Sequence, residues 1–229
     1  MDLKLTLRAN AMNVIMWWAD AAFAVRDDFK SQSGRGMSLG TGMIQCKSNK
    51  QSTTENSSTT AELIASSDAL IMIIWTNNFL KAQGYPVRDT ILFQDNMSAI
   101  KLEKNGRQSS SKRTRHLDIR HFFIKDRVKS GELNIKHCGT NDMVADYFTK
   151  PLQGAKFIQF RDLILGIKDI DSTCQIRSVL EEDLKWPDLK TEMSDKKEPN
   201  NAERNGHKVS PITKANYEPK KRVTFSDGS

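Results

Sequence analysis

Two short apolar segments, each followed directly by an aspartate, stand on either side of one long apolar stretch. This pattern restricts the fold more than any other feature. Residues 14–19 (VIMWWA) and 90–94 (TILFQ) have the composition of buried strands. Asp20 and Asp95 follow them. Residues 60–83 are too long for a strand and run into a Gly-Tyr-Pro sequence that is typical of a helix end. The order strand–helix–strand predicts two parallel strands joined by a helical crossover.

The remaining patterns complete an α/β fold. Residues 34–39 and 43–48 flank a Gly-Thr-Gly turn and predict a hairpin. Further elements are expected at 97–104, 115–129, 142–148 and 157–165 (helices) and at 132–137 (strand). We therefore predict a mixed five-stranded sheet flanked by helices. This domain is expected over residues 13–167, after an N-terminal extension at 1–12.

The composition changes near residue 168. Residues 168–229 hold four of the six prolines and equal numbers of acidic and basic residues, with few apolar side chains. Such a segment buries too little apolar surface to offset its chain entropy, so we predict a disordered polar tail. Pro219–Val223 (PKKRV) resembles a basic nuclear import signal, which makes an import receptor an expected partner and a cytoplasmic or nuclear location the expectation. An overlapping segment, 221–225, resembles a docking motif for protein phosphatase 1.

Basic charge is concentrated in one segment. Residues 101–129 contain ten Lys/Arg and three acidic residues, an excess equal to the net charge of +7 of the whole chain. A local basic stripe predicts a polyanion partner, although a solvated helix face would explain it as well. The candidate contacts with nucleic acid are Lys112, Arg113, Arg115, His116, Arg120 and Arg127. His116 is equally well explained as a buried histidine. Ile119, Phe122, Phe123 and Val128 are expected on the inward face of this helix.

The long apolar stretch is not expected to span a membrane, because no uninterrupted apolar run approaches the roughly 20 residues that a bilayer requires. The start of the chain lacks the apolar segment of a secretory signal. Three scattered cysteines favour free thiols over a disulfide framework.

Four acidic residues are candidates for metal chemistry. If the strands before Asp20 and Asp95 are parallel neighbours, both carboxylates emerge at one edge of the sheet, where α/β sheets place their ligands. Glu62 lies in the first turn of the long helix and Asp146 on a later short helix. Two carboxylate pairs at this edge would suit two Mg²⁺ ions, which prefer oxygen ligands and promote in-line displacement at phosphorus.

Each acid also has an ordinary structural explanation. Asp20 and Asp95 would serve equally well at the start of turns. Glu62 forms a capping box with Thr59, and Asp146 would be at home on a solvated helix surface. The joint pattern favours a functional site over four separate structural roles.

Seven ordered motifs give the sequence a family resemblance. They are WADAAFA (18–24), GMSLGTGMI (36–44), SSTTAEL (57–63), LFQDNMSAI (92–100), SKRTRHLDIRHFFIKDR (111–127), GELNIKH (131–137) and ADYFTKPLQG (145–154). Together they resemble the ribonuclease H region of the Pol polyprotein of copia-type (Ty1/copia) LTR retrotransposons.

The resemblance implies a ribonuclease H-like fold and a ribonuclease that cuts the RNA strand of an RNA–DNA hybrid. It implies Asp20, Glu62, Asp95 and Asp146 as catalytic residues and ligands of two Mg²⁺ ions, for which Mn²⁺ would substitute. A reverse transcriptase domain of the full polyprotein is an implied partner. Glu62 and Asp146 rest mainly on the resemblance, whereas the strand ends alone indicate Asp20 and Asp95.

The sequence departs from the family at a few positions. His137 lies at a strand end rather than in the loop where many ribonucleases H carry a mobile histidine for product release, so it is a weaker candidate. Thr60 and Leu63 stand where relatives often have glutamate and an aromatic residue. Two other hypotheses remain open. One is a catalytically silent remnant that only binds nucleic acid. The other is an integrase or transposase, which the position of the glutamate as second acid disfavours.

Overall fold

The computed structural model describes residues 3–9, 13–105 and 115–170. These residues all belong to the first of two compact units, Met1–Lys185; the second unit, Trp186–Ser229, lies outside the described residues. The predicted tail from residue 171 onward, with its import and docking motifs, lies outside them as well. The elements are β1 (Arg8–Ala9), β2 (Val14–Ala22), β3 (Gln32–Ser38), β4 (Gly40–Thr41), β5 (Gln45–Lys50), α1 (Ser58–Ala82), β6 (Asp89–Gln94), α2 (Met97–Asn105), α3 (Arg115–Lys129), β7 (Asn134–His137), α4 (Asp146–Thr149) and α5 (Gly154–Ile164).

The predicted mixed five-stranded sheet is confirmed, in the order β5-β3-β2-β6-β7. Strands β2, β3 and β5 form an antiparallel meander, and β6 and β7 add to it in parallel. The expected hairpin is therefore present. Its Gly-Thr-Gly turn contains β4, which pairs with β1 in a separate two-stranded sheet, so part of the expected N-terminal extension is bound to the domain.

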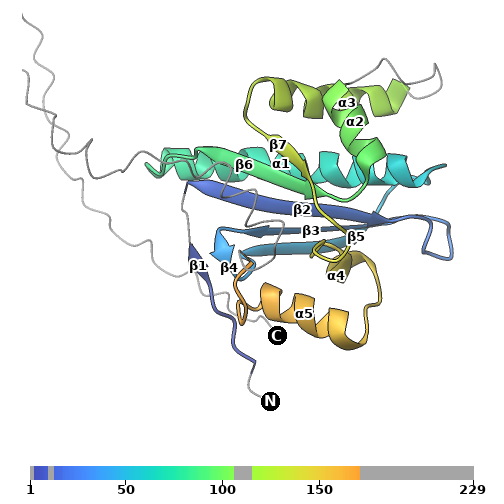
Figure 1. Cartoon of the computed structure of the whole chain (residues 1–229). Coiled ribbons are helices and arrows are strands. Elements are labelled where there is room, and N and C mark those ends of the chain that lie inside the picture. The colour runs from blue at the N-terminus through green and yellow to red at the C-terminus, as the bar shows by residue number, and fades with distance from the viewer. Residues whose placement is uncertain (1–2, 10–12, 106–114, 171–229) are drawn as a thin grey trace, which may run out of the picture. The chain divides into compact units, whose positions relative to one another are not determined.

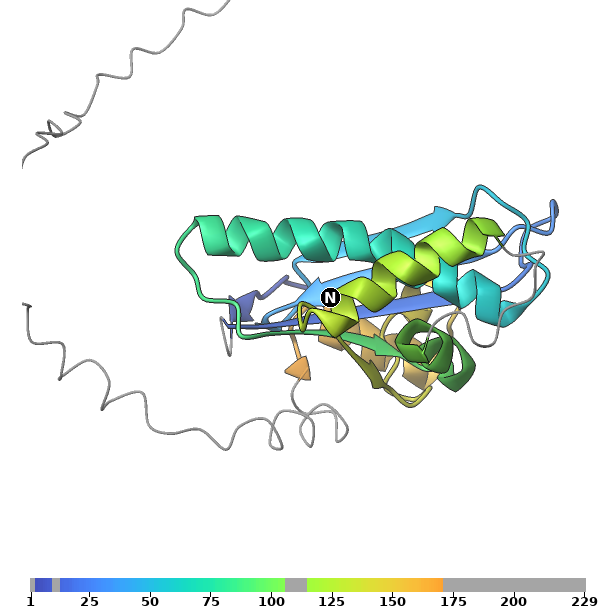
Figure 2. The same ribbon diagram turned by 90° about the horizontal axis from the view of Figure 1, so that it is seen from above.

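Helices cover both faces of the sheet (Figure 1). Successive side chains of a strand point to opposite faces, and all nine residues of β2 are buried. Trp17 packs with apolar residues of α1, α2 and α3, whereas Trp18 packs on the other face with residues that include Phe160 of α5. Figure 2 shows α3 running beside α1 above the sheet. The sheet thus lies between two hydrophobic cores, which hold its strand ends in place.

The long helix begins earlier than expected, and this changes the interpretation of Glu62. Helix α1 starts at Ser58, and the side chain of the N-cap residue Ser57 accepts a hydrogen bond from the backbone N–H of Thr60. The predicted capping box between Thr59 and Glu62 is therefore wrong. Because Ser57 already caps the helix, the buried Glu62 side chain has no capping role to explain it.

By length and composition, α1 is the one helix among the described residues that would suffice to cross a membrane. Twelve of its residues are buried, and it contacts β2, β3, α2 and α3. A helix that packs on a sheet in this way is the core helix of a globular fold.

Helix α3 has the predicted bounds but presents a different face to the core. Ile119 and Phe122 were expected inside and are 72% and 45% exposed. Ile124 is fully buried, and Phe123 and Val128 are partly buried against the same core, as expected. The apolar residues surround too much of the helix to define one face, so contact with α1 decides which of them are buried.

Two smaller predictions need correction, and one stays open. The last short helix was expected at 142–148, but α4 begins at Asp146 and the residues before it form turns. The strand expected at 132–137 starts at Asn134. The domain bounds of 13 and 167 remain a prediction. Ile170, just beyond them, is fully buried in the core.

Candidate metal-binding active site

Two of the predicted acids lie together because their strands are parallel neighbours. Strands β2 and β6 pair in parallel, with Trp18 opposite Phe93. Asp20 comes two residues after Trp18, and Asp95 comes two residues after Phe93. The two carboxylates therefore reach the same end of the sheet, as the strand-end argument predicted. Asp20 lies inside β2 rather than at its end, because the strand continues to Ala22 in pairing with β3.

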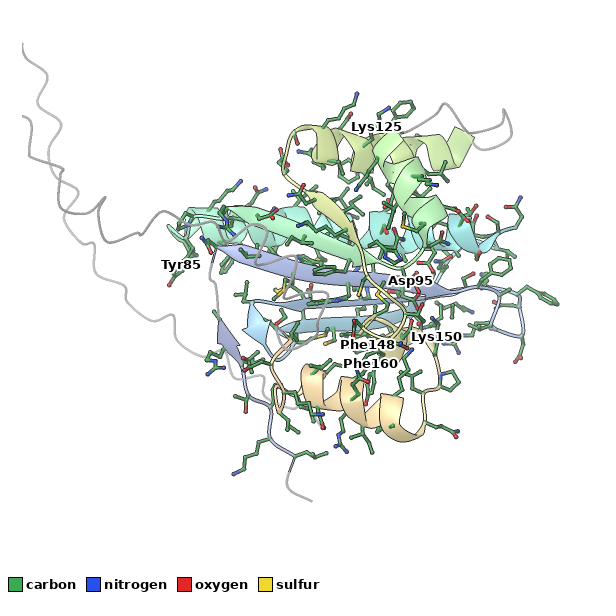
Figure 3. All side chains as sticks on the ribbon, viewed as in Figure 1. Tyr85, Asp95, Lys125, Phe148, Lys150 and Phe160 are labelled. Carbon is green, nitrogen blue, oxygen red and sulfur yellow. The ribbon has the colours of Figure 1, made fainter. Side chains whose placement is uncertain are left out.

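Helix α1 brings a third acid to this point. Oxygen atoms of Asp20, Glu62 and Asp95 all lie within 4.8 Å of one another, and we call these residues the carboxylate cluster. Asp20 and Glu62 are buried, with 1% and 5% exposure, whereas Asp95 is partly exposed. Figure 3 shows Asp95 and Lys150 at the same end of the sheet. The cluster thus has one open side, toward Asp95.

The fourth predicted acid, Asp146, lies beside the cluster and is held by two lysines. Lys150 Nζ lies 2.6 Å from Asp146 Oδ1 and 3.7 Å from Asp20 Oδ2, so its ammonium group bridges the two acids. Lys156 Nζ lies 3.0 Å from Asp146 Oδ2. The hydroxyl of Thr149 also donates to Asp20 Oδ2. All four predicted acids therefore meet at one end of the sheet, with Asp146 joined to the others through Lys150.

Sequence reasoning missed the two lysines. A signal for Lys150 was available, because it lies four residues after Asp146, a spacing that brings helical side chains together. Lys156 is on the next helix, α5, and its approach to Asp146 depends on how α5 packs.

A glycine lets α4 approach the sheet. Gly34 of β3 pairs with Asp20 of β2. A Cβ atom at Gly34 would lie 2.7 Å from Thr149 Cγ2 and 2.9 Å from the backbone oxygen of Ala145, closer than side-chain contacts allow. The absence of a side chain at this position therefore sets the position of Asp146 and Thr149 relative to the strands.

Burial and mutual repulsion make the cluster hard to ionise without a cation. Burial, together with the charges of Asp20 and Asp95, raises the pKa of Glu62 to about 9. Burial also raises the pKa of Asp20 to about 6, against the opposing effect of Lys150. The pKa of Asp95 is raised by burial too. For Lys150, burial lowers the pKa, but the neighbouring carboxylates outweigh it and leave the pKa above its ordinary value.

The residues fit a hard divalent cation. Hydrogen bonding from the Ala21 backbone and the Gln94 side chain offsets only a small part of the raised pKa of Glu62. The Oε2 atom of Glu62 is buried and has no partner among the described residues. An unpartnered buried carboxylate oxygen next to two further carboxylates is a ligand set for an ion such as Mg²⁺. The positive charge of such an ion would also stabilise the ionised form of these carboxyl groups.

A cavity of about 320 Å³ adjoins the cluster. It is lined by residues of the β2–β3 connection, among them Val25 and Arg26, and by Thr149, Lys150 and Pro151. Because Thr149 and Lys150 contact Asp20, the cavity opens beside the carboxylates. The lining of this cavity includes the positively charged side chains of Arg26 and Lys150, together with apolar surface.

The predicted nucleic-acid contacts are only partly described. Lys112 and Arg113 lie outside the described residues, and Arg115 and His116 belong to α3, but their side chains are not among those described. Arg120 forms an ion pair of 2.7 Å with Asp68 of α1. Arg127 forms one of 2.9 Å with Glu132. A role of these six residues in binding nucleic acid remains a prediction.

The weaker candidate His137 lies at the exposed end of β7, opposite Gln94 of β6. It is near enough to Asp95 that its positive charge, among smaller influences, lowers the pKa of that acid. Its role in product release stays a prediction.

The chain has the predicted mixed five-stranded sheet with helices on both faces, which is the architecture that the resemblance of its motifs implied. Among solved structures, ribonuclease H1 from Halobacterium salinarum NRC-1 aligns with a TM-score of 0.41 and 16% identity, over 59% of this chain and 94% of that one. LC11-RNase H1 in complex with an RNA/DNA hybrid aligns with a TM-score of 0.42 and 12% identity, over 59% and 93%. No model of a protein family matches the chain.

Three relatives are Pol polyproteins of plant transposons. The Retrovirus-related Pol polyprotein from transposon RE1 of Arabidopsis thaliana is 32% identical over 160 residues, which are 69% of this chain and 10% of the relative. The corresponding polyprotein from transposon RE2 is 30% identical over 170 residues, 74% of this chain and 11% of the relative. The polyprotein from transposon TNT 1-94 of Nicotiana tabacum is 31% identical over 138 residues, 60% and 10%. The chain spans about a tenth of the length of these relatives. Its resemblance to the Pol polyproteins of copia-type retrotransposons is thus confirmed over the part of the chain that aligns with them.

Proposed function

We propose that the chain is a ribonuclease H that cuts the RNA strand of an RNA–DNA hybrid with the help of divalent cations. The observation that carries this proposal is the meeting of Asp20, Glu62 and Asp95, three acids far apart in sequence, within 4.8 Å. Similarity to transposon Pol polyproteins supports it, because the motifs that hold these acids resemble the ribonuclease H region of such polyproteins.

The four acids have different tasks in this proposal. Asp20, Glu62 and Asp95 would hold one cation, and Asp146 would share a second with Asp20, where Lys150 now bridges the two. Mg²⁺ is the expected ion, because all the ligands are carboxylate oxygens. When bound, two ions of this kind activate a water molecule and stabilise the leaving oxygen of a phosphodiester.

The residues around the acids would bind and orient the substrate. Arg26 and Lys150 line the adjoining cavity and would neutralise phosphates next to the scissile bond. The basic segment before and within α3 would bind other phosphates of the duplex, through contacts that carry no sequence information. Hybrid binding is therefore expected to be independent of base sequence and sensitive to salt.

A cleavage assay tests the proposal. The full chain and its Asp95→Asn variant are incubated with a hybrid labelled on the RNA strand, with Mg²⁺ or with EDTA. The wild type should release RNA fragments only with Mg²⁺, and Asp95→Asn should release none. Asp89→Asn, at the opposite end of the same strand β6, is the matched control and should retain cleavage.

Equal cleavage by wild type and Asp95→Asn would refute the enzyme assignment. If the wild type then still bound the hybrid, the silent remnant would be the better description. A strand-transfer product with DNA ends would instead favour an integrase or transposase.

A further inference from the structure

One lysine beside the acids is held by three contacts that lie outside the carboxylate cluster. Lys156 of α5 donates hydrogen bonds of 3.0 Å from Nζ to Asp146 Oδ2 and to the backbone oxygen of Thr140. Its ammonium group also lies 5.3 Å from the centre of the ring of Phe160, which is one turn further along α5. Asp146 and Phe160 are buried, whereas the Lys156 side chain is 32% exposed.

The other lysine at Asp146 occupies the place that a cation would need. Lys150 Nζ lies 2.6 Å from Asp146 Oδ1 and 3.7 Å from Asp20 Oδ2, so a cation shared by these two acids would have to displace it. Lys156 contacts only the second oxygen of Asp146, and within the described part of the chain it forms no ion pair with the carboxylate cluster. The contacts of Lys156 are therefore compatible with a bound cation, whereas those of Lys150 are not.

Asp146 belongs to an element that cannot hold its side chain by itself. Helix α4 has four residues, and no side chain caps its first turn. A single helical turn is unstable alone, so its position depends on tertiary contacts. Lys156 supplies one of them from α5, which packs with α4 on the same face of the sheet (Figure 1). By donating to Thr140 as well, Lys156 joins Asp146 to the loop between β7 and α4.

The two lysines together set the orientation of the Asp146 carboxylate. With Lys156 on Oδ2, the Oδ1 atom is directed toward Lys150 and Asp20. Without Lys156, the buried Oδ2 atom would lose the partner that it has, which costs free energy. The carboxylate would then turn to share Lys150 between both oxygens, and Oδ1 would leave its position beside Asp20.

We propose that Lys156 is a positioning residue for Asp146, which holds Oδ2 so that Oδ1 is free to bind the cation shared with Asp20. The inference rests on the proposed function, because it takes Asp146 as a ligand of that cation. Residues that orient a metal ligand commonly change metal affinity or activity by about 10- to 100-fold when they are removed.

The test compares Lys156→Met with Lys156→Arg in the full chain. We measure the Mg²⁺ concentration that gives half-maximal cleavage of a labelled hybrid, kcat and KM at saturating Mg²⁺, and the Tm in EDTA. Lys156→Met should need about tenfold more Mg²⁺ and have a lower kcat with unchanged KM, because no substrate contact is altered. Lys156→Arg keeps the charge and the donors and should restore the wild-type Mg²⁺ requirement. Lys168→Met, which removes an exposed lysine just after α5, is the matched control and should behave as the wild type.

The direction of the Mg²⁺ effect separates positioning from simple neutralisation. If Lys156 only neutralised Asp146, the loss of its charge would make the site more negative, and Mg²⁺ would bind more tightly. Lys156→Met would then reach half-maximal cleavage at a lower Mg²⁺ concentration than the wild type. A positioning role requires the opposite shift.

A metal-free measurement tests the contact itself. Lys156→Met should lower the Tm in EDTA, because the buried Asp146 carboxylate loses a cationic partner. In an Asp146→Asn background the same substitution should lower the Tm by less, since the two side chains act through one contact. Equal decreases in both backgrounds would show that the contact is absent in solution and would overturn the inference.

An unchanged or lower Mg²⁺ requirement in Lys156→Met would also overturn the inference, whatever its Tm. Equal losses in Lys156→Met and Lys156→Arg would do the same and leave Lys156 with a packing role. Should Lys156→Met not fold, Lys156→Gln serves the same comparison, because its uncharged amide is one bond shorter and cannot reach both Asp146 and Thr140. These outcomes leave the proposed function intact, since the wild type still cuts the hybrid with Mg²⁺. If the wild type did not, the proposed function would fail, and the role of Lys156 with it.

Discussion

Replacing Glu62 by glutamine should stabilise the metal-free protein and at the same time weaken its response to Mg²⁺. Glu62 is 5% exposed, and burial raises its pKa from 4.5 to about 9. At pH 7 the folded carboxyl therefore holds a proton that the unfolded chain has released. Holding this proton at pH 7 costs free energy, and a neutral glutamine avoids that cost.

The pKa values give the size of the effect. Each pH unit between the unfolded pKa and pH 7 corresponds to about 1.4 kcal/mol, so an interval of about 2.5 units lowers the free energy of unfolding by about 3 kcal/mol. In a domain of about 150 to 250 residues, this corresponds to a change in Tm on the order of 6 to 12 °C. Glu62→Gln should raise the metal-free Tm at pH 7 by an amount of this order.

The pH dependence has a defined sign. Because the folded pKa of Glu62 is raised, the stability from its bound proton is fully present below about pH 4.5 and is lost as the pH rises through about 9. The Tm of the metal-free wild type should therefore fall as the pH rises across this range. The Tm of Glu62→Gln should fall by less over the same pH range. The remaining fall is due partly to Asp20, whose pKa is raised to about 6.

Scanning calorimetry with EDTA and with Mg²⁺ measures both effects. Mg²⁺ should raise the Tm of the wild type, because an ion that binds only the folded state stabilises it. It should raise the Tm of Glu62→Gln by less, since one ligand of the carboxylate cluster is gone. Glu132→Gln, which replaces an exposed acid, controls for the loss of one carboxylate. The reasoning is refuted if Glu62→Gln melts below the wild type in EDTA at pH 7 or keeps the full Mg²⁺ shift.

Four further predictions follow from the site and the fold. Gly34→Ala should lower both Tm and kcat, because its Cβ would push α4 away from the sheet at a cost of about 1 to 3 kcal/mol; unchanged values would show that α4 adapts freely. Lys150→Met should lower the metal-free Tm, and Mg²⁺ should narrow the gap to the wild type in melting experiments, since the ion replaces the lost positive charge. Arg113→Glu should weaken hybrid binding and reduce the slope of log affinity against log salt by about one, with kcat at saturation little changed; an unchanged slope in a titration would exclude a phosphate contact. Truncation after Ile170 should leave a cooperative melting transition and Mg²⁺-dependent cleavage, whereas loss of the transition would give the following residues a structural role.

The parts of the site that the sequence predicted are those set by local pattern. Asp20 and Asp95 were found because each follows a short apolar strand, and a long helix between the strands makes them parallel neighbours. Glu62 and Asp146 had to be taken from the family resemblance, because an acid on a helix has ordinary explanations. For Glu62 the structure removes one of these, since Ser57 caps the helix.

The parts that the sequence did not predict depend on packing between distant elements. The rotation of α3 follows from its contact with α1, including the ion pair of Arg120 with Asp68, and pattern alone placed Ile119 on the wrong side. Glu103 was not predicted as a buried residue, because a charged residue on an amphipathic helix is almost always exposed. Lys156 reaches Asp146 only because α5 packs beside α4.

The first and last described segments of the domain run side by side. The backbone N–H of Thr6 donates to the oxygen of Leu165, and Arg8 forms an ion pair of 3.1 Å with Asp169. Strand β1 pairs with β4, which follows the end of β3 that pairs with Met16 of β2. The carboxylates lie toward the other end of β2. A polypeptide that continued in both directions would thus enter and leave at one corner, remote from the acids. Such a domain can be inserted in a longer chain, or circularly permuted, with both junctions away from the carboxylate cluster.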